Sequence, residues 1–170
     1  MKKITILVPA YNEEESLPLL YERVSKIMNE MKNYEFELLF VNDGSKDKTL
    51  SILEKIAEND KKVKVISFSR NFGHQCAVTA GLKYVTGDAV VIIDADLQDD
   101  YACCIPQMID DFVSGSDIVY GVKVSRTADP LLKRMSAQVF YRLQESMGMK
   151  TIFNHADFRL MSRRALDILS

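Results

Sequence analysis

Residues 90–100 read VVIIDADLQDD, an aliphatic run followed at once by a segment rich in aspartate. The run at 90–93 has the composition of a strand buried on both faces, which is typical of a parallel sheet covered by helices. Four aspartates then fall within the next seven residues. The stretch predicts a central strand of an α/β sheet, with carboxylates crowded where that strand ends.

The rest of the chain alternates further apolar runs with amphipathic segments of helical length. Strands are expected at 4–8, 37–41, 63–68, 89–93 and 117–120, and helices at 16–31, 47–59 (or from Ser45), 73–85 and 104–113. This order predicts an α/β, Rossmann-like domain with a mostly parallel central sheet and helices on both faces. Beyond Pro130 the pattern predicts a helix near 131–147, an irregular segment, and a short helix from Ser162.

The composition is that of one ordinary domain. The chain has 170 residues, of which 47% are hydrophobic and 27% charged, and its formal net charge of −2 gives no reason to expect nucleic acid as a partner. Three cysteines, Cys76, Cys103 and Cys104, do not form a disulfide framework, which indicates a reducing compartment. The N-terminal apolar run is too short for a signal peptide, and no run approaches the roughly 20 residues of a membrane span. The chain as given is therefore expected to be soluble.

Polar residues follow each of the first four expected strands. In chain order these segments read PAYNEEE, NDGSKDKT, SRNFGHQ and DADLQDD. Open parallel sheets bind their ligands at the carboxyl ends of the strands, so the four loops are expected to converge on one edge. Turn formation alone explains any single loop, but the convergence predicts a ligand site.

Asp94 and Asp96 are the candidate metal ligands. They flank Ala95 at the end of a strand, where an extended backbone would point both side chains the same way. Two adjacent carboxylates repel each other unless a cation lies between them. Mg²⁺ and Mn²⁺ accept oxygen ligands and commonly bind through one or two carboxylates together with substrate phosphates. A metal that bridges the protein to a diphosphate is the prediction, and a solvated acidic turn is the alternative.

Other phosphate and metal motifs are missing from the sequence. It contains no G-x-x-x-x-G-K-[ST] loop, no G-x-G-x-x-G after the first strand, and no partners at zinc-ligand spacing for His74 or His155. Any phosphates must be held by the metal and by basic side chains. The candidates, which are otherwise ordinary solvated surface, are Arg70, Lys123, Arg126, Lys133 and Arg134.

Six segments resemble the family 2 glycosyltransferases, and within them the branch that glycosylates polyprenyl phosphates. They are VPAYNEEESL, VNDGSKDKT, SRNFGHQCAVTAGL, DADLQD, YGVKVSR and NHADFRLMSRR, which together span almost the whole chain. The resemblance implies a GT-A fold and inverting transfer of a hexose from a nucleotide sugar, with UDP-glucose favoured by analogy, to a polyprenyl phosphate in cell-envelope glycan biosynthesis. It also implies Mg²⁺ or Mn²⁺ as cofactor and a full-length protein at the cytoplasmic face of the membrane.

The resemblance assigns roles to individual residues. The implied nucleotide-sugar site comprises Pro9, Ala10, Tyr11, Glu13, Asp43 (at the base), Asp94 (near the ribose), Lys123 and Arg126 (near the phosphates). Asp96 and Gln98 would face the metal and the diphosphate. Asp157 would be the general base, and the alternative is a buried partner for Arg159 or Arg163. A phosphate monoester has a second pKa of about 6 and is already mostly ionised at neutral pH, so Asp157 would chiefly orient such an acceptor.

Two departures from the family pattern qualify these expectations. Asp99-Asp100-Tyr101 stand where the family frequently has Pro-Pro after DLQD, which should alter that loop. Membrane-associated segments that follow the catalytic domain in this branch are missing, so residues 1–170 are expected to be a single truncated catalytic domain with an incomplete acceptor site. The expected partners are the nucleotide sugar, the polyprenyl phosphate and, through the missing part, the membrane surface, with a homo-oligomer possible.

Three other functions remain open from the sequence. A saccharide hydroxyl could be the acceptor, although DLQD and HADFRL disfavour it and a chain without Trp cannot carry the Q-x-x-R-W motif of processive synthases. The chain could instead be a nucleotide-sugar-binding fragment without turnover. A nucleotidyltransferase is more distant, because the first loop is acidic where a basic, Gly-rich triphosphate loop would be needed.

Overall fold

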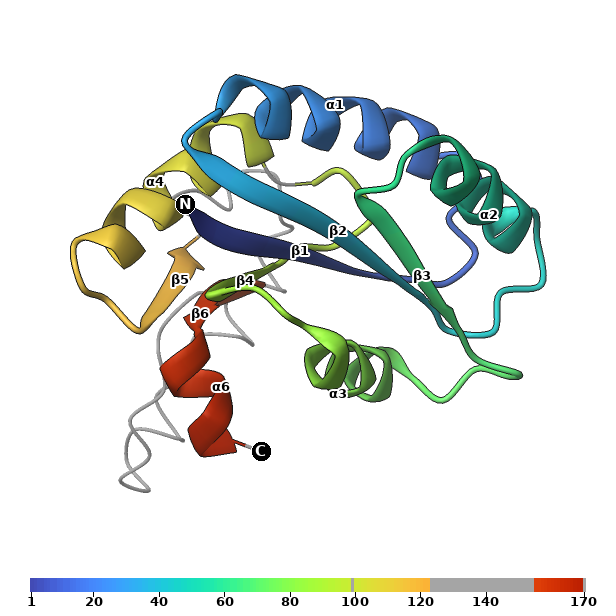
Figure 1. The fold of residues 1–170 in the computed structure, drawn as a ribbon. Coiled ribbons are helices and arrows are strands. Elements are labelled where there is room, and N and C mark those ends of the chain that lie inside the picture. Colours follow the sequence, from blue (N-terminus) through green and yellow to red (C-terminus); the bar gives the residue numbers. More distant parts are fainter. Residues whose placement is uncertain (99, 123–154, 170) are drawn as a thin grey trace, which may run out of the picture.

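The computed structural model describes residues 1–98, 100–122 and 155–169 (Figure 1). Helices and strands alternate along the first part of the chain, and two neighbouring strands complete the sheet. The elements are β1 (Lys2–Ala10), α1 (Leu17–Glu30), β2 (Tyr34–Asn42), α2 (Thr49–Asn59), β3 (Val63–Ser67), α3 (His74–Tyr84), β4 (Ala89–Ile92), α4 (Tyr101–Val113), β5 (Ile118–Val122), β6 (His155–Ser162) and α6 (Arg163–Leu169).

The sheet is mixed but mostly parallel, as the sequence predicts. Its strand order is β3-β2-β1-β4-β6-β5. The pairs β1–β2, β1–β4 and β2–β3 are parallel, whereas β6 runs antiparallel to both of its neighbours. The first four strands therefore end at the same edge.

Helices cover both faces of this sheet, which confirms the predicted layers. α1, α2 and α4 lie on one face, and α3 and α6 lie on the other (Figure 1). Strand residues alternate between the two cores: Ile6 and Val8 pack in the first, and Leu7 packs in the second. Because both faces are covered, β1 is buried continuously from Ile4 to Ala10, which is why this stretch is apolar apart from the buried Thr5.

The expectation of an irregular segment before the last helix is wrong over residues 155–162. These residues form β6, which inserts between β4 and β5. Its sequence HADFRLMS mixes charges with apolar residues, so no apolar run indicates a strand. Phe158 and Leu160 nevertheless fill the first core, and β4 and β5 supply hydrogen-bonding partners on both sides. The helix expected at 131–147 lies outside the described residues.

The described part of the chain shows no helix long and apolar enough to cross a membrane. All three cysteines are free thiols, in agreement with the sequence analysis.

Candidate active site

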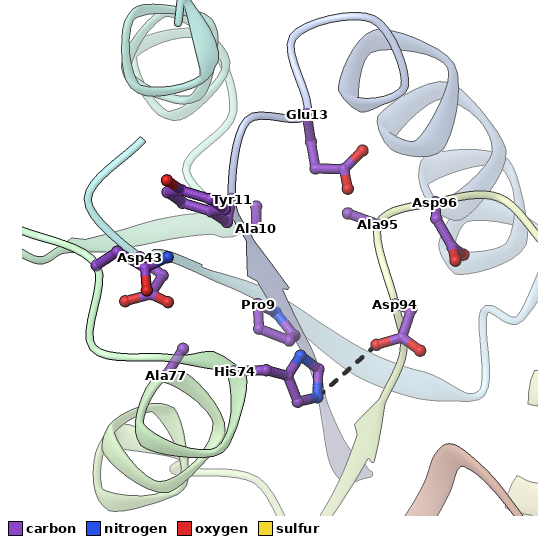
Figure 2. A pocket seen from close by; sticks show the side chains of 11 residues that line it. Pro9, Ala10, Tyr11, Glu13, Asp43, His74, Ala77, Asp94, Ala95 and Asp96 are labelled. Carbon is purple, nitrogen blue, oxygen red and sulfur yellow. Dashed lines mark ion pairs between the residues drawn. The ribbon is translucent and has the colours of Figure 1, made fainter. Parts of the chain in front are cut away.

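A pocket of about 330 Å³ opens at the carboxyl edge of the parallel strands (Figure 2). It is formed where the segments after β1, β2, β3 and β4 meet, so the convergence expected from the sequence is present. Its lining comprises Pro9, Ala10, Tyr11, Glu13, Asp43, Asn71, His74, Ala77, Asp94, Ala95 and Asp96. Seven of these are residues that the sequence analysis places at the donor or the metal.

The loops after β1 and β2 are held together by hydrogen bonds that bring Glu13 to the pocket. The backbone N–H of Glu13 donates to Oγ1 of Thr49 at 2.8 Å, and that of Glu14 donates to Oδ2 of Asp47 at 3.1 Å. Burial raises the pKa of the Asp47 carboxyl, but the hydrogen bonds from Thr49 and Glu14 outweigh it and hold the pKa below its usual value. The β1–α1 loop is thereby fixed on the rim by an ionised side chain.

Asp43 ties the end of β2 to the loop before α3. Its side chain is only 3% exposed, and its two oxygens accept the backbone N–H groups of Phe72 at 2.7 Å and Gly73 at 2.9 Å. The adjacent Gly44 has φ 63°, and a Cβ there would lie 2.2 Å from the backbone carbon of Arg70. Since a carboxylate has about four acceptor sites, these two bonds leave Asp43 capacity for a ligand donor.

The DADLQ segment leaves β4 and turns sharply at the pocket. Asp94 is half-buried, and its Oδ1 lies 3.9 Å from Nε2 of His74 (Figure 2). Asp96 is exposed, and its Oδ1 accepts the backbone N–H of Gln98 at 3.1 Å across Leu97, whose φ is 60°. Ala95 between the two carboxylates faces the first core. Both aspartates line the pocket, whereas Gln98 is not among the lining residues.

The acidic residues suit a hard divalent cation that also binds phosphate. Within the described ranges no three His, Cys, Asp or Glu side chains are grouped closely enough to hold a metal by themselves. Mg²⁺ typically needs only one or two carboxylates, because substrate phosphates and water complete its octahedral shell. Asp94 and Asp96 at a pocket mouth fit that arrangement, with Asp96 exposed to the solvent from which such an ion would enter.

The backbone of Asp157 lies in β6, at the same edge of the sheet as Asp94. Ile92 of β4 is paired with Arg159 of the antiparallel β6. Asp157 lies two residues before Arg159 in β6, and Asp94 lies two residues beyond Ile92, past the last paired residue of β4, so both backbones lie toward the carboxyl edge of β4. The side chain of Asp157 lies outside what the structure describes, as do Lys123, Arg126, Lys133 and Arg134.

The arginines that are close to Asp157 in sequence make contacts in different parts of the structure. Arg163 donates to the carbonyls of Val85 and Gly87, next to the start of β4 and therefore away from the pocket. This contact disfavours Arg163 as the partner of Asp157. Arg164 pairs with Asp117, whose pKa is lowered by the hydrogen bonds from Arg164 and Ser162. Nε of Arg159 is buried and has no hydrogen-bond partner among the described residues.

Four pocket residues were not among the predicted site residues: Asn71, His74, Ala77 and Ala95. The signal for Asn71 and His74 was present, because both belong to SRNFGHQ, the polar segment after the third strand. Asn71 and His74 follow that strand at the same edge, and Ala77 lies one turn into α3. Arg70 is exposed and has its guanidinium carbon 4.6 Å from the centre of the Phe72 ring.

Solved structures with the same architecture are glycosyltransferases of the GT-A class. Glucosyl-3-phosphoglycerate synthase of Mycobacterium tuberculosis, determined with UDP, superposes with a TM-score of 0.67 at 20% identity, covering 96% of this chain and 57% of that chain. A mannosyltransferase of Pyrobaculum calidifontis, determined with GDP-Man and Mn²⁺, gives 0.65 at 22% identity and covers 99% of this chain and 47% of that one. This similarity shows that the present chain has the GT-A fold.

The chain belongs to glycosyl transferase family 2, whose sequence profile matches residues 5–169. It is 45% identical over 166 residues to a bactoprenol glucosyl transferase of Shigella phage SfX, which covers 97% of this chain and 54% of that protein. A prophage bactoprenol glucosyl transferase homologue of Escherichia coli K12 is 44% identical over 166 residues, which cover 97% of this chain and 54% of that protein. An uncharacterized glycosyltransferase of Bacillus subtilis is 44% identical over 96% of this chain and 50% of its own. The chain thus spans about half the length of the curated relatives that it matches.

Proposed function

We propose that this chain is the catalytic domain of an inverting glycosyltransferase that moves glucose from UDP-glucose to a polyprenyl phosphate. The observation that carries the proposal is the pocket in which Asp43, Asp94 and Asp96 meet at the carboxyl edge of the sheet. The choice of donor and acceptor follows relatives named bactoprenol glucosyl transferase at 44–45% identity. We further propose that the reaction takes place at the cytoplasmic face of a membrane, where such an acceptor is embedded.

In the proposed donor complex, the nucleoside lies between the segments after β1 and β2. The Asp43 carboxylate, already fixed by two backbone donors, accepts a hydrogen bond from the imide N–H of uracil. The 41% exposed Tyr11 and the buried Ala10 contact the base, and Asp94 hydrogen-bonds to the ribose. In this arrangement the nucleoside occupies the pocket from the buried Asp43 to Asp94 near the mouth.

The diphosphate lies at the mouth of the pocket beside Asp96, where a divalent metal would bind it. When bound, Mg²⁺ or Mn²⁺ supplies charge neutralisation for the leaving diphosphate. Asp96 and Gln98 are the proposed protein ligands, with Lys123 and Arg126 as proposed additional phosphate contacts. Gln98 is exposed and lies two residues after Asp96, but it is not among the residues that line the pocket.

Asp157 acts on the acceptor in this proposal. The acceptor oxygen attacks the anomeric carbon while the nucleoside diphosphate leaves from the opposite face. Because a phosphate acceptor is mostly ionised at neutral pH, Asp157 orients it and accepts any residual proton. The register between β4 and β6 supports this role, because it directs the part of β6 that carries Asp157 toward the edge of the sheet where Asp94 follows β4.

The donor assignment is tested by thermal unfolding with UDP, GDP, UDP-glucose, UDP-GlcNAc and GDP-mannose, each with Mn²⁺ and with EDTA. A ligand at 100 times its Kd adds about 2.7 kcal/mol, which shifts the midpoint by several degrees. We expect the uridine ligands to stabilise the chain only with Mn²⁺, and Asp96→Ala to remove the shift. The exposed Asp110→Ala on α4 is the control. Stabilisation by guanosine ligands alone would contradict the base assignment, and no shift with any nucleotide would contradict the site.

The acceptor is tested separately with radiolabelled UDP-glucose and either a polyprenyl phosphate or a soluble saccharide. Transfer to the lipid phosphate is the expected result. Transfer to a saccharide hydroxyl would identify the other acceptor class, and nucleotide binding without any product in a membrane-competent longer protein would indicate a binding module.

A further inference from the structure

Tyr101 makes contacts that connect the DADLQ segment to β6. It is the first residue of α4, and its side chain is 2% exposed. Its hydroxyl donates to the backbone carbonyl of Asp94 at 2.7 Å. Its ring packs edge to face on Phe158, with 5.9 Å between ring centres and an interplanar angle of 71°. One side chain thus contacts both the residue that begins the acidic turn and the residue that follows Asp157.

The hydroxyl bond closes the acidic loop at its base. β4 ends at Ile92, and the backbone bond from Ile93 to the carbonyl of Leu7 is the last one that ties this strand to β1. Asp94 lies past that bond, and the chain then turns through Leu97 before α4 begins. The bond from Tyr101 to Asp94 joins the first residue of this loop to the first residue of α4, so the loop carrying Asp96 is anchored at both ends.

The ring contact fixes the closed loop relative to the antiparallel strands. Phe158 is 2% exposed and fills the space above Gly121 of β5, where a Cβ would lie 2.7 Å from its ring carbon Cδ1. Phe158 therefore has little room to move, and the ring of Tyr101 rests on a rigid surface. Since Phe158 is the neighbour of Asp157, a displacement of Tyr101 would change the spacing between the acidic loop and the backbone of Asp157.

We propose that Tyr101 is a positioning residue of the active site, which acts by fixing the Asp94–Asp96 segment and the Asp157-bearing strand at one mutual spacing. This inference rests on the proposed function, because the spacing matters only if the Asp94–Asp96 segment binds the donor and Asp157 acts on the acceptor. Tyr101 is 2% exposed and is not among the described residues that line the pocket. Its effect is transmitted through the Asp94 carbonyl.

The test compares Tyr101→Phe with Tyr21→Phe in the 170-residue chain. Both changes remove one hydroxyl and keep the ring, and Tyr21 donates to Asp60 at 3.0 Å in a contact between α1 and the end of α2, away from the pocket. The first readout is amide hydrogen exchange over residues 94–101 in metal-free protein, and the second is the Kd of UDP with Mn²⁺ by calorimetry. We expect Tyr101→Phe to accelerate exchange in this segment and to weaken UDP binding about 2- to 12-fold, as the loss of one hydrogen bond predicts.

Tyr21→Phe should change neither the exchange over 94–101 nor the Kd of UDP. The thermal midpoints of Tyr21→Phe and Tyr101→Phe should fall by similar amounts, because each loses one hydrogen bond. Unchanged exchange over 94–101 in Tyr101→Phe would overturn the bracing role without reference to any ligand. An unchanged Kd for UDP, in a protein whose wild type binds UDP, would overturn the link to the site. Failure of the wild type to bind UDP with Mn²⁺ would instead contradict the proposed function, and the exchange measurement would still decide whether Tyr101 holds the loop.

Discussion

Asp43 shows how a single buried carboxylate prepares the pocket before any ligand is present. Its two backbone acceptor contacts hold the loop at 72–73, and its own N–H donates to the carbonyl of Ala10 at 2.9 Å. The same residue therefore connects three of the segments that form the pocket. A turn-forming aspartate would have been a sufficient explanation of the sequence, but the structure assigns it a tertiary role.

Asp43→Asn tests this role. The amide presents an N–H₂ group to one of two backbone donors, which leaves Phe72 or Gly73 without an acceptor. We expect the free energy of unfolding to fall by about 1–3 kcal/mol and UDP affinity to fall at least about tenfold. Urea denaturation and calorimetry measure the two effects. Asp60→Asn, which alters a carboxylate that likewise accepts two hydrogen bonds but lies outside the pocket, should leave UDP affinity unchanged.

Glu37 makes the stability of the fold depend on pH. Its side chain is 6% exposed and lies 2.6 Å from Nζ of Lys64 and 3.2 Å from Nζ of Lys3. Burial raises the pKa of Glu37, but the two ammonium groups outweigh it, so the pKa is lowered. The ion pairs therefore stabilise the fold above the ordinary glutamate pKa of about 4.3, and this contribution is lost as the pH falls through the lowered value.

We expect Glu37→Gln to reduce the free energy of unfolding at pH 7 by about 1–3 kcal/mol. The difference from the wild type should shrink toward pH 3, because the wild-type carboxyl is then being protonated. Urea denaturation at both pH values measures it, with the exposed Glu35→Gln on the same strand as control. A difference that stayed constant between the two pH values would rule out the ionised state as its cause.

At the scale of elements, α3 is placed by its close approach to the sheet. Gly81 has no room for a side chain, because a Cβ would lie 2.4 Å from Cδ1 of Leu7 and 3.0 Å from Cγ2 of Val41. Both neighbours belong to the buried core on that face. Since His74 and Ala77 of the same helix line the pocket, the glycine contact also determines how far these side chains lie from β1 and β4.

Gly81→Ala separates packing from helix propensity. Alanine favours a helix by about 1 kcal/mol over glycine, so propensity alone predicts stabilisation. We expect destabilisation by about 1–3 kcal/mol, because the added methyl group pushes α3 away from Leu7. Thermal unfolding reports the sign, and a raised midpoint would show that the core yields to the methyl. Thr79→Ala, at an exposed position of this helix, should stay within about 0.5 kcal/mol of the wild type.

At the scale of the whole molecule, the sheet joins two parts of the chain that are far apart in sequence. β6 returns to lie between β4 and β5, so among the described strands β5 is joined to the sheet through β6. The last strand also supplies Phe158 and Leu160 to the core under α1 and α4. The parallel half of the sheet and the antiparallel half are therefore expected to unfold as one unit.

A chain that ends at Val122 tests this coupling. It lacks β6, so β4 becomes an edge strand and the core under α4 loses Phe158. We expect the loss of a cooperative thermal transition and rapid proteolysis within α4, because its apolar face would be left partly uncovered. A sharp transition at the wild-type midpoint would show that the parallel half is an independent folding unit.

Most of the parallel half and much of the pocket were determined by the sequence alone. Parallel strands covered on both faces are near-continuous apolar runs, and such strands place the polar segments that follow them at one edge. These local rules were enough to predict β1 to β4 and to bring Tyr11, Asp43 and Asp96 to one site.

The antiparallel half and the internal supports of the pocket were decided only by the tertiary structure. β6 carries no apolar run, and it becomes a strand because β4 and β5 offer it hydrogen-bonding edges. The Asp43 contacts and the bond from Tyr101 to Asp94 likewise depend on which backbone groups are left near each buried side chain after the elements have packed. Local periodicity contains no information about such long-range partners, and for that reason they became visible only in the folded chain.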